Sequence, residues 1–289
     1  MNPNGMLGPV HLTVADLDRS MEFYGGVLGL RSRAAYGSAT GTATLTADGA
    51  TPLVVLHVDP KAQPKPPHTT GLYHYALLVP TRPDLARALL RLMEARYPIE
   101  GASDHLVSEA LYLSDPDGNG IEIYADRPRD VWPTRQGRLQ MATDPLDVQG
   151  LLREVSGNAP WQGLAAGTRV GHVHLHVADL ARAEAFYREV LGFELVLHFG
   201  RSAAFLSVGG YHHHIGLNTW AGEGAPPPPP DAAGLRFFTL LLEDGEELKR
   251  LTARLADAGV PPHAQDGGQL VRDPSGNGIL AVAPVTTRM

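Results

Sequence analysis

Two stretches of the chain share one pattern and decide the fold: Val14-Ala-Asp-Leu-Asp-Arg-Ser-Met-Glu-Phe-Tyr-Gly-Gly-Val-Leu-Gly-Leu30 and Val177-Ala-Asp-Leu-Ala-Arg-Ala-Glu-Ala-Phe-Tyr-Arg-Glu-Val-Leu-Gly-Phe193. They are 177 − 14 = 163 positions apart. Residues 71–79 recur at the same offset as residues 234–242. A pattern repeated in this way indicates a duplication. We therefore expect two domains, at residues 1–130 and 169–289, joined by a linker at residues 131–168.

Each half divides again into two similar modules. In the first module, Asp16 is expected to cap a helix that follows a strand, and Gly29 to end that helix. Strand-like runs then follow at residues 43–47 and 53–58. The same order of β-α-β-β-β is expected four times, at the following residues: 6–58, 71–127, 169–220 and 234–284. The sequence therefore predicts an α+β fold of four βαβββ modules.

Composition narrows the classes of function. The chain has 289 residues, 43% of them hydrophobic, and a net charge of −7. The charged residues form no basic stripe, which argues against nucleic acid as a partner. Apolar runs are only as long as strands, and the first residues lack the features of a signal peptide, so neither a membrane span nor export is expected. Cysteine is absent, which fits a cytoplasmic protein and leaves histidine and carboxylate as metal ligands.

One hairpin carries more chemistry than a fold requires: His105-Leu-Val-Ser-Glu-Ala-Leu-Tyr-Leu-Ser-Asp-Pro-Asp-Gly-Asn-Gly-Ile-Glu122. Pro116 and the glycines after it predict a chain reversal, so His105, Tyr112 and Glu122 can converge across it. The turn recurs as Asp273-Pro-Ser-Gly-Asn-Gly-Ile279. We therefore interpret the aspartate that begins each turn as structural.

The four modules and the repeated Val-Ala-Asp-Leu…Phe-Tyr…Val-Leu-Gly pattern resemble the vicinal oxygen chelate superfamily. Glyoxalases, bleomycin-resistance proteins and type I extradiol ring-cleavage dioxygenases belong to it. The spacing of His105, Tyr112, Asp115-Pro116 and Glu122 is similar to the extradiol dioxygenase signature, from which Ser103 departs. The resemblance implies that His105 and Tyr112 hydrogen-bond the substrate and that Glu122 binds iron.

The same resemblance implies that a metal is held by the first strands of two modules and the last strand of one. The second module supplies His74 and Glu122. An Fe(II) oxygenase needs a second histidine, because its usual ligand set is two histidines and one carboxylate. The register of the third module favours His172 over His174. A competing set of His11, His74 and Glu122 would pair the second module with the first rather than with the third.

Two further histidine positions are expected to face the substrate. Extradiol enzymes place a catalytic histidine where this chain has Tyr211-His212-His213-His214, and His213, followed three residues later by Gly216, fits that spacing. His214 is the alternative. If this segment is a strand, His213 points away from both neighbouring histidines. We expect His174 and His214 to contact substrate.

These expectations describe an Fe(II)-dependent extradiol dioxygenase that acts on a catechol-type diol with O2. Mn(II) could occupy the same ligands, and a homo-oligomer is left open. A glyoxalase-like isomerase or lyase is one alternative; it would need a fourth protein ligand, for which only His214 is placed. A drug-binding resistance protein is another, although it has no need of His105, Tyr112 and Glu122 in this register.

Overall fold

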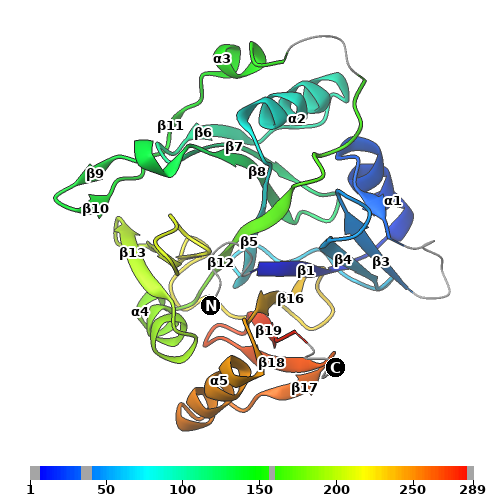
Figure 1. The fold of residues 1–289 in the computed structure, drawn as a ribbon. Coiled ribbons are helices and arrows are strands. Elements are labelled where there is room, and N and C mark those ends of the chain that lie inside the picture. The colour runs from blue at the N-terminus through cyan, green and yellow to red at the C-terminus, as the bar shows by residue number, and fades with distance from the viewer. Residues whose placement is uncertain (1–6, 34–40, 156–159, 285–289) are drawn as a thin grey trace, which may run out of the picture. The chain divides into compact units, whose positions relative to one another are not determined.

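The computed structural model describes residues 7–33, 41–155 and 160–284 (Figure 1). Its contacts define two compact units, of which unit 1 comprises residues 1–12, 65–73 and 172–289, and unit 2 comprises residues 13–64 and 74–171. Three strands run through both units: β1 (Leu7–Val14), β5 (Gly71–Leu78) and β12 (Arg169–His176). The elements follow the order β-α-β-β-β four times, so the predicted α+β class is confirmed.

The first module begins with β1 and a helix that changes its winding. The elements after β1 are α1 (Leu17–Met21), the π-helical turn η1 (Glu22–Val27), β2 (Arg31–Ser32), β3 (Thr42–Thr46) and β4 (Pro52–Val58). Asp16 caps α1 as predicted, because its carboxylate accepts a hydrogen bond from the Arg19 N–H at 3.0 Å. Gly29 follows the helix with a φ of +69°, a conformation that favours glycine.

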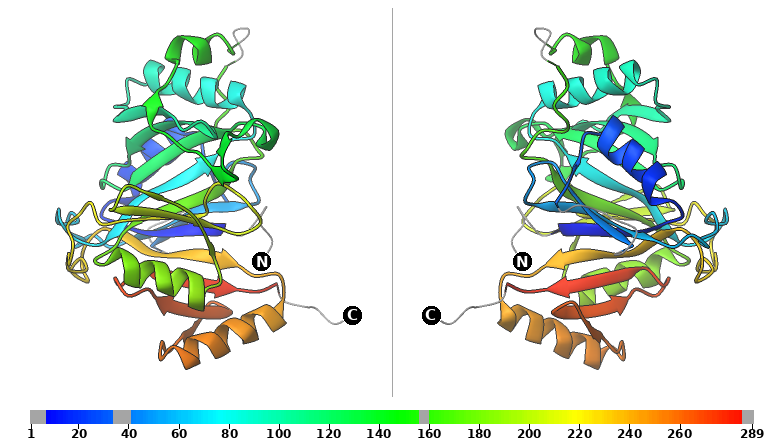
Figure 2. Two further views of the ribbon diagram at one scale, coloured as in Figure 1. Left: turned by 90° about the vertical axis from the view of Figure 1, so that its left-hand side faces the viewer. Right: turned by 90° about the vertical axis from the view of Figure 1, so that its right-hand side faces the viewer.

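The second module carries the hairpin. Its elements are β5, α2 (Arg82–Glu94), β6 (Gly101–Asp104), β7 (Ser108–Ser114) and β8 (Gly120–Asp126). Thr81 caps α2, and Leu85, Leu89 and Leu92 form its buried face. Figure 2 shows α2 lying along one face of β6, β7 and β8. This packing leaves the opposite face of these strands for the polar side chains of the site.

The segment that links the halves contains several short elements. It contains η2 (Arg129–Val131), β9 (Thr134–Arg135), β10 (Arg138–Leu139), β11 (Asp144–Pro145) and α3 (Val148–Leu152). Strand β11 extends the sheet of the second module, because Asp144 pairs with Asp104 and Pro145 with Ser103 on β6.

The third and fourth modules repeat the plan. The third contains β12, α4 (Leu180–Ala185), η3 (Phe186–Val190), β13 (Glu194–Phe199), β14 (Ala203–Ser207) and β15 (Ile215–Asn218). The fourth contains β16 (Gly234–Leu241), α5 (Gly245–Asp257), β17 (His263–Gln265), β18 (Gly268–Arg272) and β19 (Gly278–Val282). The expectation that His212–His214 lie in a strand is wrong, because β15 begins only at Ile215 and these residues form the turn before it.

Two large sheets contain most of the strands in the described ranges. One has eight strands in the order β17-β18-β19-β16-β1-β4-β3-β2, and the other has nine in the order β11-β6-β7-β8-β5-β12-β15-β14-β13. The first strand of the second module is therefore next to that of the third, and the first strand of the first module is next to that of the fourth.

A buried carboxylate organises the same turn in both halves. The Asp115 carboxylate accepts hydrogen bonds from the Asn119 backbone and side chain at 2.8 and 2.9 Å and from the Tyr24 hydroxyl at 2.8 Å. Asp273 has the equivalent contacts with Asn277 and with the Tyr187 hydroxyl, the latter at 3.2 Å. Burial raises the pKa of both aspartates. The tyrosine of each repeated Phe-Tyr pair therefore holds a turn.

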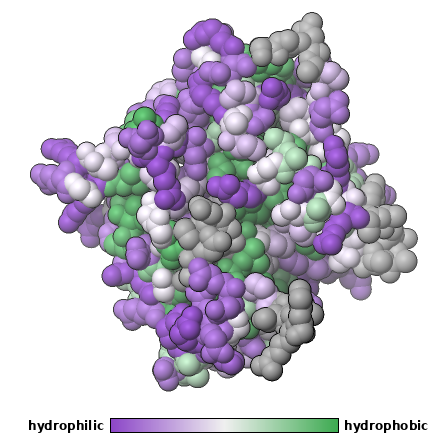
Figure 3. All heavy atoms as spheres, viewed as in Figure 1, coloured by the Kyte–Doolittle hydropathy of each residue, from purple (hydrophilic) through white to green (hydrophobic). Residues whose placement is uncertain are grey.

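Hydrophilic residues cover most of the surface in the view of Figure 3, and hydrophobic residues show in smaller groups among them. In the part of the chain that the structure describes, no helix is long and apolar enough to cross a membrane.

We expect Tyr24→Phe to lower the midpoint of thermal unfolding by about 2–6 °C at pH 7, because a buried carboxylate loses a donor worth about 1–2 kcal/mol. Asp115 already has a raised pKa, so folding favours its protonated form and the carboxylate is present in the folded state only above that pKa. The deficit should therefore shrink as the pH falls through the raised pKa. Circular dichroism melts across this range test the prediction, which fails if the deficit is constant or grows on acidification.

Candidate metal centre

His74 and Glu122 form the centre of the candidate site. They lie on the parallel strands β5 and β8, where His74 is opposite Gly120 and Ala76 is opposite Glu122. Nε2 of His74 is 3.1 Å from Oε2 of Glu122, and the two residues are 5% and 3% exposed. A carboxylate at this depth is stable only with hydrogen-bond donors or a positive charge beside it. The structure thus brings together the two residues that the sequence assigned to one metal.

Tyr112 lies directly across the hairpin from Glu122, with which it pairs on β7 and β8. Its ring centroid is 5.6 Å from that of His74. Nε2 of His105 is 2.6 Å from the Tyr112 hydroxyl. The predicted convergence of His105, Tyr112 and Glu122 on the hairpin is therefore present in the geometry.

The other ring nitrogen of His105, Nδ1, determines which group donates in the hydrogen bond between His105 and Tyr112. Its Nδ1 is 2.7 Å from the carbonyl oxygen of Ala142. A carbonyl can only accept, so Nδ1 carries the proton. In the neutral imidazole, Nε2 then accepts the hydrogen bond that the Tyr112 hydroxyl donates.

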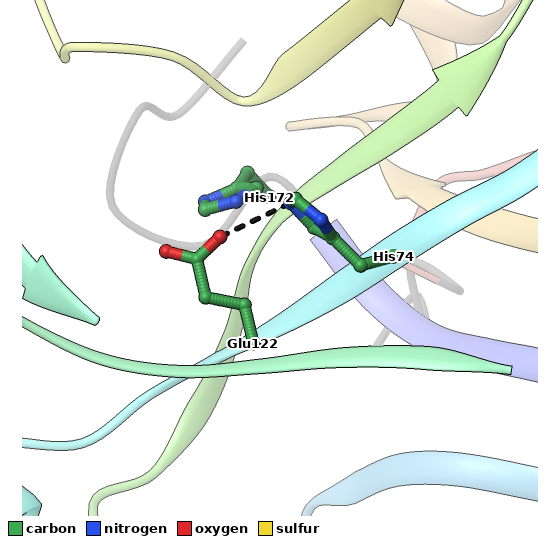
Figure 4. A group of neighbouring side chains, drawn as sticks. All are labelled: His74, Glu122 and His172. Atoms are coloured by element: carbon green, nitrogen blue, oxygen red, sulfur yellow. Dashed lines mark ion pairs between the residues drawn. The ribbon is translucent and has the colours of Figure 1, made fainter. Parts of the chain in front are cut away.

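His172 is the third residue of the cluster that Figure 4 draws. One ligand atom from each of His74, Glu122 and His172 lies within 4.8 Å of the others. His172 is 1% exposed and follows Gly171 on β12. A Cβ added to Gly171 would be 1.9 Å from the Tyr124 hydroxyl oxygen, so only glycine lets the chain pass so close to this side chain of β8.

The triple histidine before β15 lies beside His172. The His213 and His172 rings are 4.1 Å apart, and Nδ1 of His213 is 2.8 Å from Nδ1 of His212. The expectation that His213 points away from both its neighbours is therefore wrong, because this segment is a turn and not a strand. The Nδ1 of His214 accepts a hydrogen bond from the Val208 N–H at 3.4 Å, which ties it to the preceding loop.

His174 lies in a group of aromatic rings. Its ring centroid is 5.6 Å from that of Phe205, 5.4 Å from that of Trp220 and 5.2 Å from that of Tyr73. A Cβ on Gly216 would be 2.7 Å from the His174 ring, so the glycine leaves room for this ring. The small residue three positions after His213 thus has a direct packing reason.

His11, the competing ligand, stacks on Phe237 with a centroid distance of 4.1 Å. Phe237 takes the place of His74 in the fourth module, since 237 − 163 = 74. The equivalent of the candidate site in the first and fourth modules therefore contains an apolar ring where the second module has a ligand.

A group of charged residues around the hairpin was not predicted. Glu109 is 5% exposed, and its carboxylate accepts hydrogen bonds from Arg82 Nε at 2.5 Å and from Arg127 Nη2 at 3.2 Å. Arg127 also holds Asp104 and lowers the pKa of that carboxyl. One sign of this group is visible in the sequence, because Glu109 interrupts a mostly apolar stretch.

Comparison with known proteins agrees with this architecture. The model of the Glyoxalase/Bleomycin resistance protein/Dioxygenase superfamily matches residues 6–123 and 169–280. The catechol-2,3-dioxygenase of Bacillus subtilis (strain 168) is 47% identical over 271 residues, which cover 93% of each chain.

Solved structures show the same fold at lower sequence identity. One from Bacillus subtilis subsp. subtilis str. 168 has a TM-score of 0.66 at 15% identity and covers 96% of this chain and 86% of its own. Glyoxalase I from Zea mays has a TM-score of 0.59 at 17% identity, with coverage of 96% and 92%. With four βαβββ modules and a family model that spans most of its length, this chain belongs to the Glyoxalase/Bleomycin resistance protein/Dioxygenase superfamily.

Proposed function

We propose that the chain is a metal-dependent extradiol dioxygenase that opens the ring of a catechol-type diol with O2. The observation that carries this proposal is the buried pair of His74 and Glu122 beside the hydrogen-bonded pair of His105 and Tyr112. A metal site is thus adjacent to groups that can exchange a proton with a substrate oxygen. The name of the Bacillus subtilis relative, catechol-2,3-dioxygenase, supports the same reaction.

His74, Glu122 and His172 would hold the metal. Two nitrogens and one carboxylate oxygen are the ligand set typical of Fe(II) oxygenases, which need open positions for substrate and O2. Two ligand atoms at roughly 2.1 Å from an ion and at a right angle are about 3 Å apart, and the His74–Glu122 distance of 3.1 Å fits this. The donor set therefore suits a first-row divalent metal, and we propose Fe(II), with Mn(II) as the ion that the same ligands also accept.

The metal, when bound, supplies a Lewis acid that brings diol and O2 together and makes the diol hydroxyls more acidic. Because the Tyr112 hydroxyl donates to Nε2 of His105, its oxygen is left to accept a hydrogen bond or a proton from a substrate hydroxyl. His105 supports that hydroxyl through its Nε2 and can take the proton from it. Burial of His74 and Glu122 excludes water from this side of the site.

His213 is the proposed histidine that takes or returns a proton on the other side of the site. Its ring lies 4.1 Å from that of His172, and it is 6% exposed. His214 is less suited, because its Nδ1 already accepts a backbone hydrogen bond. The same contact weakens the glyoxalase-like alternative, which would require His214 as a fourth ligand.

The direct test is ring cleavage by the metal-loaded protein. The purified chain is loaded with Fe(II) without oxygen, mixed with catechol or 3-methylcatechol and exposed to air. The proposal predicts oxygen uptake in equal amount to the diol consumed and a yellow ring-opened product. No oxygen uptake with a panel of catechols, by protein with bound iron, would contradict it.

Glu122→Gln should weaken Fe(II) binding by more than about 100-fold, because even groups that only support a metal ligand are worth about 10–100-fold. The amide keeps the shape of the side chain but removes its charge. Glu94→Gln, at the exposed end of α2, is the matched control and should leave binding unchanged. Iron content after dialysis measures both, and equal content in the two variants would refute the assignment of Glu122.

The choice between His172 and His11 can be made with two single variants. His172→Ala should lose iron on dialysis and lose oxygen uptake, because it removes a proposed ligand. His11→Ala should retain iron, because its ring packs on Phe237. The reverse result would favour the competing ligand set.

Tyr112→Phe should reduce kcat by roughly 10- to 100-fold with unchanged iron content, because it removes the hydroxyl that links a substrate oxygen to His105. Oxygen uptake at saturating catechol and metal analysis of the same sample test this. A loss of iron that parallels the loss of activity would show that Tyr112 supports the metal site instead.

A further inference from the structure

The linker between the halves contacts His105, although it contributes no residue to the proposed ligand set. The carbonyl of Ala142 accepts from Nδ1 of His105 at 2.7 Å, and the Ala142 N–H donates to the His105 carbonyl at 3.4 Å. Two residues later, β11 pairs with β6, where Asp144 is opposite Asp104. The linker thus pairs with the sheet at Asp104, the residue before His105. It also supplies the Ala142 carbonyl that accepts a hydrogen bond from the His105 ring.

The residues on either side of His105 are held by one carboxylate. Asp104 accepts the Leu106 N–H at 2.8 Å, which closes a tight turn around His105, and Leu106 has a φ of +68°. Both terminal nitrogens of Arg127 bind the Asp104 carboxylate, Nη2 at 2.8 Å. The backbone N–H of Arg127 also donates a hydrogen bond to the Val107 carbonyl at 2.8 Å. A bidentate pair of this kind fixes orientation as well as distance.

The same network contacts the linker again just after α3. Glu109, which is buried, bridges Arg127 and Arg82. Nη1 of Arg82 binds Glu154, just after α3, at 2.7 Å. Since the Trp132 indole donates to the Arg127 carbonyl at 2.9 Å, the beginning of the linker is attached to the same arginine. The linker is therefore attached to this network at Trp132 and again at Glu154.

We propose that the linker, Asp104 and Arg127 together position His105, so that its Nδ1 is held by Ala142 and its Nε2 accepts from Tyr112. Asp104 and Arg127 act here as positioning residues and do not contact substrate. The catalytic consequence rests on the proposed dioxygenase function, but the positioning itself does not.

The orientation matters because the two ring nitrogens have different roles. With Nδ1 protonated, the neutral ring offers Nε2 as an acceptor, and the Tyr112 hydroxyl is directed by this bond. If the ring changed tautomer, Nε2–H would face the hydroxyl as a donor. Tyr112 would then have no acceptor for its proton at this position.

The kinetic test compares Arg127→Met with Arg127→Lys and with Arg87→Met as matched control. Arg87 forms an exposed pair with Asp84 on α2, so its loss removes a guanidinium without touching the hairpin. We expect Arg127→Met to reduce kcat by about tenfold with a KM for catechol within about twofold, at unchanged iron content. Arg127→Lys should recover part of this loss, and Arg87→Met should have no effect. An effect of Arg127→Met no larger than that of Arg87→Met would overturn the proposal.

The tautomer test needs no turnover and so is independent of the proposed function. Long-range proton–nitrogen NMR on protein with labelled histidine identifies which ring nitrogen of His105 carries the proton, and His105→Asn assigns the signal. We expect Nδ1–H in the wild type and in Arg87→Met, and a shift toward Nε2–H or averaging in Arg127→Met. Nε2–H in the wild type would overturn the proposal even if catechol is cleaved.

A folding defect in Arg127→Met would be detected by circular dichroism, and Asp104→Asn then replaces it. Asparagine can still accept the Leu106 N–H but loses the charged pair with Arg127. The same change of tautomer and of kcat is expected, and wild-type values of both in a folded Asp104→Asn protein would contradict the proposal.

Discussion

The contact between His74 and Glu122 is the interaction on which the rest of the site depends. A carboxylate that is 3% exposed inside a sheet must be compensated, and the only histidine that faces it from β5 is 3.1 Å away. Such a pair is costly for a structure that needs only packing, since an apolar residue at either position would do. The cost is explained if a bound metal supplies positive charge next to the Glu122 carboxylate. The fold then provides two parallel strands in register, and the hairpin places Tyr112 directly opposite the carboxylate.

The duplication supplies an internal comparison. Both halves keep the tyrosine, the turn aspartate and the asparagine that hold the Asp-Pro-x-Gly-Asn turn, because this network is needed for folding wherever the module is used. The ligand positions have diverged instead: Phe237 replaces the histidine and Leu280 replaces the glutamate in the fourth module. His11 then stacks on an apolar ring. The turn is therefore a property of the fold, whereas Glu122, on the strand β8 that follows the turn, belongs to one site only.

The sequence predicted the modules and the class of fold because these depend on local patterns and on one offset of 163 positions. The convergence of His105, Tyr112 and Glu122 was predicted for the same reason, since hairpin spacing is local. The orientation of His213 was not, because alternation holds only in strands and residues 211–214 form a turn. The roles of Ala142 and Arg127 could not be read from the sequence either, since they depend on where the linker returns to the sheet. The division into domains at residues 1–130 and 169–289 stays a prediction.

The central proposal is that His74, Glu122 and His172 hold a single metal ion. X-ray diffraction from Fe(II)-loaded crystals, with data collected on both sides of the iron absorption edge, tests it most directly. We expect one strong anomalous peak at a bonding distance of about 2.0–2.3 Å from one nitrogen of each histidine and from the Glu122 carboxylate. A peak that contacts His11 in place of His172, or fully iron-loaded crystals with no peak at Glu122, would contradict the claim.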